Sequence, residues 1–197
     1  MIENTPVLNA EDKAYYPPGG LLIWIIVFLE FITFSAGIMV FLSFRQGDIE
    51  LFNESQQMLN STFGMVNTIV LITSGLLMAT ALGVLKSGNN KKTVFYISLT
   101  VLFGLVFLIL KGFEYNEKMA MGLGFGYNQF FMFYWLLTGF HFIHVLVGVL
   151  LLTYMRYKTK SGFYSGSNYE DVETVGVFWH MCDLIWIFLF PIIYLLH

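Results

Sequence analysis

Residues 135–152 read WLLTGFHFIHVLVGVLLL, and this stretch decides the fold. Its 18 residues include no acid, and two histidines are the only ionisable side chains, which is typical of a membrane-spanning helix. Thr138, His141 and Gly148 share one face of that helix. His144 follows His141 by three residues, which places a second imidazole on the same stripe. Lipid disfavours such a stripe, and we therefore expect it to face other helices.

A second stretch has the same character. Residues 178–196 read FWHMCDLIWIFLFPIIYLL, with His180 and Asp183 also three residues apart. Two apolar helices that each carry polar pairs can satisfy one another inside a protein. The sequence therefore predicts an all-α fold, a polytopic transmembrane bundle.

The composition supports a membrane protein. Apolar residues make up 57% of the chain, whereas charged residues make up only 12%, about half the usual share in globular proteins. The net charge of −3 predicts no basic surface and no nucleic-acid partner. Cys182 is the one cysteine in the sequence, which excludes a disulfide within the chain and any two-cysteine metal site.

Hydropathy predicts five spans in a single transmembrane domain, residues 1–197. The polar residues 45–64 are expected to connect the first span to the second, and no removed signal peptide is expected. The predicted spans cover about residues 21–44, 65–85, 93–110, 130–154 and 175–196.

Basic residues predict the orientation. The N-terminus and the connections after the second and fourth spans share one side, with seven lysines and arginines against three on the other side. This excess favours a cytoplasmic N-terminus and a C-terminus outside. The seven are Lys13, Lys86, Lys91, Lys92, Arg156, Lys158 and Lys160, and the three are Arg45, Lys111 and Lys118.

Glu30 is the only charged residue of the first predicted span, about 15 Å along its helix and so near mid-membrane. It has two interpretations. One is a satisfied structural carboxyl, uncharged because burial disfavours the charge. The other is a group that handles protons or couples a substrate. Asn67, on the second span, is a candidate partner for it.

The histidines also have two interpretations. His141 and His144 could give two ligands to one metal, with His180 as a third and Asp183 as a further ligand or a supporting group. The interpretation that we favour is a metal-free hydrogen-bond network that joins the fourth and fifth helices and includes Glu173. A neutral imidazole suits this role because it carries one donor and one acceptor.

Together these residues resemble the cytochrome c oxidase subunit III family. The resemblance covers roughly residues 18–196, and the two histidine-bearing motifs make it specific. Five spans match the short bacterial form, which lacks the two additional N-terminal helices of the seven-helix members. The matching positions are Thr138-Gly139-Phe140-His141 with His144 and Gly148, Phe178-Trp179-His180 with Asp183 and Trp186, Glu30 in FLEFITFSAG, Asn67-Thr68, Ser74-Gly75, Glu114-Tyr115 and Glu173.

The resemblance implies an accessory, non-redox role in aerobic respiration. Such a chain has no catalytic residue, metal or redox cofactor of its own; it packs on subunit I, binds phospholipid, and supports proton uptake and stability. Haem and copper belong to the partner subunits I and II, and a respiratory supercomplex is a further expected assembly. The implied location is a bacterial inner (plasma) membrane with a periplasmic C-terminus.

Residue counts agree with this role. A haem–copper catalytic subunit needs six histidine ligands and this sequence has four; a copper-bearing subunit II needs two cysteines and it has one. The alternatives are an accessory subunit of a nitric oxide reductase, a small transporter that depends on Glu30, and a membrane haem enzyme.

Overall fold

The computed structural model describes residues 17–196, and in that range the chain forms six helices and no strand. Five of them are long and apolar enough to cross a membrane, so the predicted all-α bundle of five transmembrane helices is confirmed. The helices are α2 (Leu21–Gly47), α3 (Ile49–Gln57), α4 (Ser61–Lys86), α5 (Asn90–Ala120), α6 (Gln129–Lys160) and α7 (Glu170–Tyr194).

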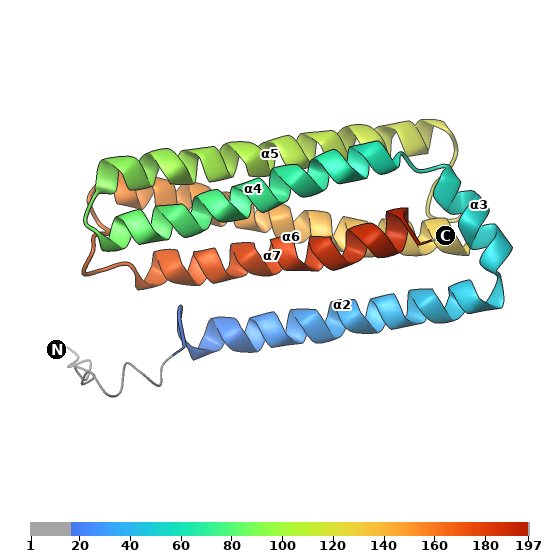
Figure 1. Ribbon diagram of the computed structural model, residues 1–197, viewed down its shortest axis with the longest axis horizontal. Helices are drawn as coiled ribbons and strands as arrows, with labels where there is room; N and C mark the ends of the chain where they lie inside the picture. Colours follow the sequence, from blue (N-terminus) through green and yellow to red (C-terminus); the bar gives the residue numbers. More distant parts are fainter. Residues whose placement is uncertain (1–16, 197) are drawn as a thin grey trace.

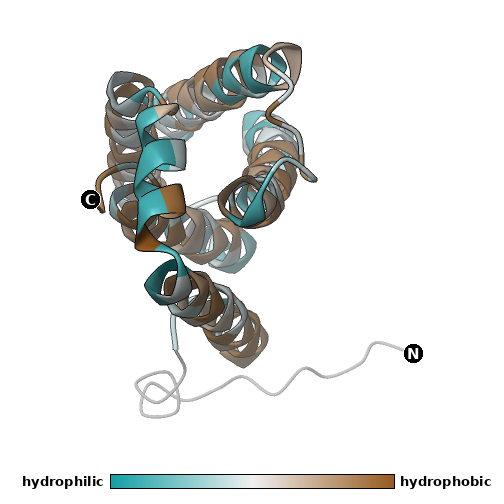
Figure 2. Ribbon diagram, turned by 90° about the vertical axis from the view of Figure 1, so that its right-hand side faces the viewer, coloured by the Kyte–Doolittle hydropathy of each residue, from teal (hydrophilic) through white to brown (hydrophobic). Residues whose placement is uncertain are grey.

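Helices α4 to α7 form an antiparallel group, in which α4 contacts α5 and α7 while α6 contacts α5 and α7 (Figure 1). Helix α2 lies beside this group and packs on α6 and α7. Short α3 and the α5–α6 connection lie at one end, which we call the α3 end; the α4–α5 and α6–α7 connections lie at the opposite end. Hydrophilic residues gather on α3 and at helix ends, whereas the long helices are mainly hydrophobic (Figure 2).

Asparagines start three of the long helices. The side-chain oxygens of Asn60, Asn89 and Asn128 accept hydrogen bonds from backbone N–H groups in the first turns of α4, α5 and α6. These N–H groups have no partner within their own helix, so each cap contributes about 1 kcal/mol. The α4–α5 turn is only three residues long and uses Gly88 at φ 81°.

Trp179 of α7 forms the centre of the four-helix group. Its indole N–H donates to Ser74 Oγ of α4 at 3.2 Å. A Cβ on Gly104 of α5 would lie 2.8 Å from the indole ring, and one on Gly148 of α6 would lie 2.7 Å from it. The two glycines therefore make room for this fully buried indole, which packs α7 against three neighbours.

Each long helix extends beyond its predicted span at one end or both, and two features add to the sequence analysis. Helix α5 continues to Ala120, beyond the predicted limit at residue 110, because Lys111 and Glu114 face the protein interior and pair there. Helix α3 forms within the connection 45–64, where Asp48 Oδ1 accepts from Leu51 N at 3.1 Å and Phe52 is buried.

Candidate functional site

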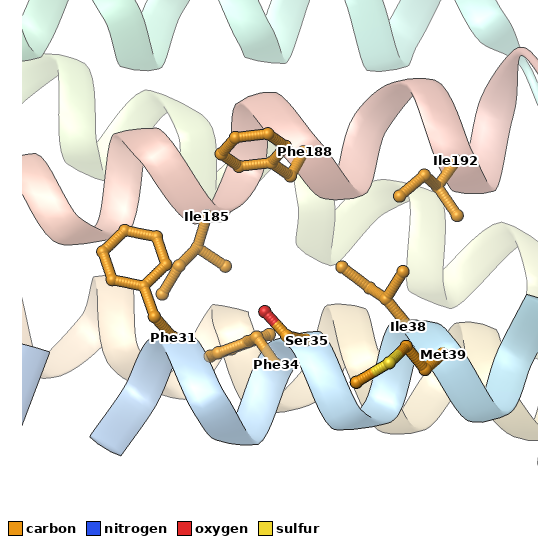
Figure 3. A pocket seen from close by; sticks show the side chains of 8 residues that line it. All are labelled: Phe31, Phe34, Ser35, Ile38, Met39, Ile185, Phe188 and Ile192. Carbon is orange, nitrogen blue, oxygen red and sulfur yellow. The ribbon is translucent and has the colours of Figure 1, made fainter. Parts of the chain in front are cut away.

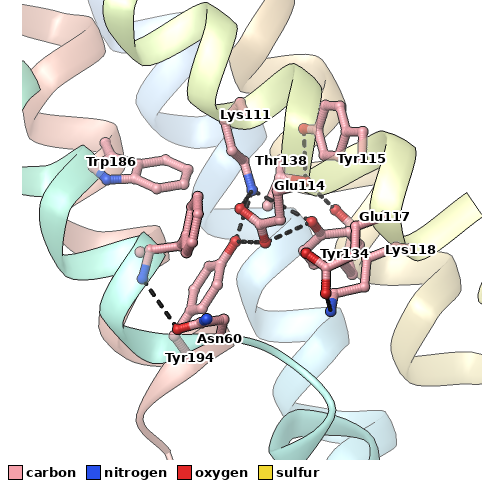
Figure 4. Close-up of polar contacts among 12 residues, drawn as sticks. Asn60, Lys111, Glu114, Tyr115, Glu117, Lys118, Tyr134, Thr138, Trp186 and Tyr194 are labelled. Atoms are coloured by element: carbon pink, nitrogen blue, oxygen red, sulfur yellow. Dashed lines mark hydrogen bonds and ion pairs between the residues drawn. The ribbon is translucent and has the colours of Figure 1, made fainter.

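A closed group of polar side chains lies inside the four-helix group toward the α3 end. It consists of Lys111 and Glu114 from α5, Tyr134 from α6 and Tyr194 from α7, and we call it the buried cluster (Figure 4). Each of the four residues is at most 3% exposed. Three helices therefore meet at one ion pair.

In the buried cluster, each hydrogen-bond donor faces an acceptor. Lys111 Nζ donates to Glu114 Oε2 at 3.1 Å and to the Tyr194 hydroxyl at 2.6 Å. The hydroxyls of Tyr134 and Tyr194 donate to Glu114 Oε1 at 2.8 and 2.6 Å. The lysine has only donors and an ionised carboxylate has only acceptors, so a phenol between them can serve both.

Aromatic rings surround the ammonium group. Lys111 Nζ lies 4.9 Å from the ring centroid of Tyr115 and 5.3 Å from that of Trp186, and it faces the rings of Tyr134 and Tyr194 as well. Ring faces attract cations. The cluster is thus neutral overall, enclosed by aromatic side chains, and suited to holding helices together.

Further contacts secure the α3 end. The last carbonyls of a helix have no partner within it, and here Gln56 Nε2 donates to Ile193 O at 2.9 Å while Ser61 Oγ donates to Tyr194 O at 3.2 Å. Lys118 Nζ donates to Met58 O at 2.9 Å. The short helix α3 and the turn after it are therefore tied to α7 and α5.

Glu30 contacts His144 from the predicted histidine group. Glu30 Oε1 lies 3.2 Å from His144 Nε2, and His144 Nδ1 lies 2.8 Å from Phe140 O. Because a carbonyl can only accept, Nδ1 carries a proton. Glu30 Oε2 is buried without a hydrogen-bond partner within residues 17–196, so the contact at Nε2 is the link from this carboxyl to α6.

His180 and Asp183, both on α7, form a second acid–base pair, which we call the seam pair. His180 Nδ1 lies 3.1 Å from Asp183 Oδ2. The Asp183 carboxylate packs against Gly75 of α4, where a Cβ would overlap Oδ2. The side chain of His180 is 41% exposed, so this pair opens on the outer surface between α4 and α7.

His141 stands apart from both pairs. It is fully buried, stacks on Trp186 with centroids 5.2 Å apart, and has no hydrogen-bond partner within residues 17–196. Asn67 is also buried without a hydrogen-bond partner in the described chain. Glu173 lies at the end opposite α3, where it binds Lys86 Nζ at 2.6 Å and accepts from Gly19 N at 3.1 Å.

The residues grouped by the sequence analysis therefore occupy separate places. His144 pairs with Glu30, His180 pairs with Asp183, and Glu173 ties α7 to α4 and to the segment before α2. Within residues 17–196, no three histidine, cysteine, aspartate or glutamate side chains converge in a way that could hold a metal ion.

The sequence analysis missed most of the buried cluster. It singled out Glu114 but treated Lys111 only as a loop charge, and it gave no role to Tyr134 or Tyr194. One signal was available: lysine and glutamate three residues apart share a helix face. The tyrosines carry no such local signal because they come from other helices.

An apolar groove runs between α2 and α7. It has a volume of about 440 Å³, and Phe31 and Ile38 of α2 face Ile185 and Phe188 of α7 across it (Figure 3). Ser35 adds the one hydroxyl in its lining. Apart from that hydroxyl, the groove is lined by apolar side chains.

One polar contact lies outside the spans, in the α6–α7 connection. Tyr164 donates its hydroxyl to Asp171 Oδ2 at 2.9 Å and is 2% exposed. Burial is the main cause that raises the pKa of Tyr164 to about 12, and the hydrogen bond to Asp171 and its negative charge act in the same direction. The phenol therefore stays protonated over the whole physiological range.

Comparison with known proteins gives a consistent result. The family described as Cytochrome c oxidase subunit III matches residues 22–197. A Heme-copper oxidase subunit I+III from Aeropyrum pernix is 33% identical over 133 residues, which are 67% of this chain and 16% of that protein.

Two proteins named Cytochrome c oxidase subunit 3 are also similar. The one from Synechocystis sp. is 33% identical over 132 residues, 66% of this chain and 55% of that protein. The one from Thermostichus vulcanus is 27% identical over 198 residues, 99% of this chain and 96% of that protein. The chain thus spans about half or less of several relatives and nearly all of the last.

Proposed function

The chain belongs to the cytochrome c oxidase subunit III family, and we propose that it is an accessory, non-redox subunit of a haem–copper oxidase. In this proposal it packs on the catalytic subunit I, and haem and copper are held by subunits I and II. The observation that carries the proposal is the family match over residues 22–197, which includes nearly all of the five long helices.

The relatives support a partnership with subunit I. One of them is named as subunit I+III, so in that protein the two subunits form one chain. A fused chain contains one copy of each part, joined by the same backbone. For the present chain we propose the same partnership between separate chains, with subunit II and a respiratory supercomplex as further assembly partners.

Lipid binding is a second part of the proposal. The α2–α7 groove is lined almost wholly by apolar side chains, and its volume of about 440 Å³ suits an acyl chain of a phospholipid. Glu30 directly precedes Phe31 of the groove lining. A lipid seated there would fill the space between α2 and the four-helix group.

Glu30 has a structural role in this proposal. Its contact with His144 links α2 to α6 near mid-membrane. Support of proton uptake by subunit I would then be indirect, through the stability and lipid content of the complex.

The orientation that we propose is a cytoplasmic N-terminus and a periplasmic C-terminus in a bacterial inner membrane. Lys86, Arg156 and Lys160 belong to the end opposite α3. Lys111 was counted for the α3 end, but its side chain is buried in the protein interior. The basic side is therefore richer than the sequence count suggests. Lys13, also part of that count, lies outside the described residues.

A mild-detergent purification tests the proposal. The chain carries an affinity tag in its native host, and optical spectra are recorded on the eluted material. We expect haem-bearing partner subunits to co-elute and to consume oxygen. Elution of this chain without haem-bearing partners would contradict the accessory role, and nitric oxide reduction without oxygen consumption would identify a different reductase as its partner.

A further inference from the structure

The seam pair lies at a depth where an open polar site is costly. His180 is ten residues after the start of α7 and Asp183 is eleven before its end. At 1.5 Å per residue, the pair is about 15 Å from either end of the helix. This is the middle of a hydrocarbon core about 30 Å thick.

The seam pair is more open than the other mid-membrane pair. The His180 side chain is 41% exposed, against 13% for His144. Asp183 Oδ1 has no hydrogen-bond partner within residues 17–196, while Oδ2 is held by His180 Nδ1 and packs against Gly75. Asp183 Oδ1 is itself buried, so the part of the pair that reaches the outer surface is the accessible imidazole of His180.

The surface around the seam pair is apolar. On α4, Leu76 follows Gly75 directly, and Ile72 shares the face of Leu76. On α7, Leu184 follows Asp183, and Ile187 lies two turns beyond His180 on the same side. All four side chains are exposed. Lipid could cover these four side chains but could not satisfy the polar pair between them.

We propose that this α4–α7 seam is the surface on which a transmembrane helix of the haem-bearing partner subunit packs, with a hydrogen-bonding side chain that faces His180. The proposal rests on the proposed function and specifies the docking face. His180 Nδ1 is held by Asp183 Oδ2, so a hydroxyl, amide or carboxyl on that helix would pair with the other ring nitrogen, Nε2. An acyl chain has no hydrogen-bonding group for this imidazole, and lipid headgroups lie about 15 Å away on either side.

Photo-cross-linking in the intact complex tests this directly. A benzophenone amino acid replaces Leu76 or Leu184 at the seam, and in control chains it replaces Leu102 of α5 or Leu150 of α6, all of which are exposed. Illumination of native membranes should join the seam positions to the haem-bearing subunit and leave the controls unjoined to it. Partner adducts from the controls alone would overturn the proposal.

A steric variant gives a second readout. Leu76→Trp should lower the haem recovered per tagged chain about tenfold, which corresponds to about 1.4 kcal/mol of binding free energy. Leu102→Trp, the matched control on α5, should leave it unchanged. Seam adducts at twice the mass of this chain would show a second copy there, and seam adducts with lipid alone would show no partner; either result overturns the proposal.

These results separate the two proposals. If the wild-type chain co-elutes with haem-bearing subunits but both Trp variants retain them equally, the seam is not the docking face and the accessory role still stands. If the wild-type chain never co-elutes with them, the accessory role itself fails. Cross-linking needs only a wild-type seam pair, so it remains decisive even if Leu76→Trp does not fold.

Discussion

The buried cluster and the seam pair both place an acid and a base within one turn of a membrane helix, yet their surroundings differ. In the buried cluster, two tyrosines from neighbouring helices complete the hydrogen bonds of Lys111 and Glu114, and every member is enclosed. In the seam pair, Asp183 keeps one buried oxygen without a partner in the described chain, and His180 is open to the outside.

The difference shows that polar groups, which are energetically unfavourable inside a membrane, can serve two purposes. A closed set needs nothing beyond the chain and serves to fix helix positions. An open set at mid-membrane is satisfied only when another molecule covers it. The contrast therefore predicts that changes in the buried cluster lower the stability of the chain itself, whereas changes in the seam pair lower its retention in the complex.

The largest effect is expected from breaking the ion pair of the buried cluster. Lys111→Met leaves Glu114 as an uncompensated buried charge, and we expect a loss of about 3–5 kcal/mol of unfolding free energy. Thermal unfolding of the purified chain in detergent measures it. Lys92→Met, an exposed lysine at the start of the same helix, is the control.

The double variant Lys111→Met with Glu114→Leu sharpens this test. Removing both charges leaves no unpaired ion, so much of the lost stability should return. If the single and double variants were equally unstable, the loss would come from packing rather than from charge.

A smaller effect is expected at the seam. Gly75→Ala pushes a methyl group into the Asp183 carboxylate, and a forced shift of this kind costs about 1–3 kcal/mol. We expect the complex to lose this chain during purification, measured as haem recovered per chain. Gly83→Ala on the same helix meets nothing within 4 Å and should behave as wild type.

The Tyr164–Asp171 contact provides a reference outside the membrane spans. Its phenol pKa is raised from 10 to about 12 in the folded state, so the folded chain binds more protons than the unfolded one between these values. The contribution is complete below pH 10 and is lost as the pH rises through 12. Tyr164→Phe should remove that slope and cost about 1 kcal/mol at neutral pH, seen in unfolding curves recorded across pH 9–12.

The smallest effect is expected at Glu30. Glu30→Gln keeps the shape and a hydrogen-bond partner for His144 while removing the ionisable proton. Oxygen consumption and proton release in reconstituted vesicles should stay near wild type, as they should for Glu50→Gln, a change at an exposed residue of α3. A loss of about tenfold, or about 1.4 kcal/mol in the barrier, with intact haem spectra would show that Glu30 transfers protons.

The sequence predicted what depends on local pattern. Long apolar stretches gave the five spans, and the i,i+3 spacing of His180 and Asp183 gave one of the observed pairs. Contacts between distant segments followed no local pattern. Tyr194 meets Lys111 across 83 positions of sequence, and Glu30 meets His144 although the two were assigned to different groups.

The sequence also did not predict how deeply each histidine side chain is buried. His141 and His144 were expected to share one network because they share a helix stripe, but a side chain's surroundings depend on its neighbours. His141 stacks on Trp186 within the core, while His144 reaches α2. Only the packing of α2 and α7 around α6 separates the two.

The central claim is that this chain is a docked accessory subunit whose partners carry the redox centres. The most direct measurement is the visible spectrum of the affinity-purified complex before and after a harsher detergent strips its partners. The account predicts a haem signal that leaves together with the partner subunits, in proportion to them. A haem signal that stays with this chain after the partners are gone would contradict it.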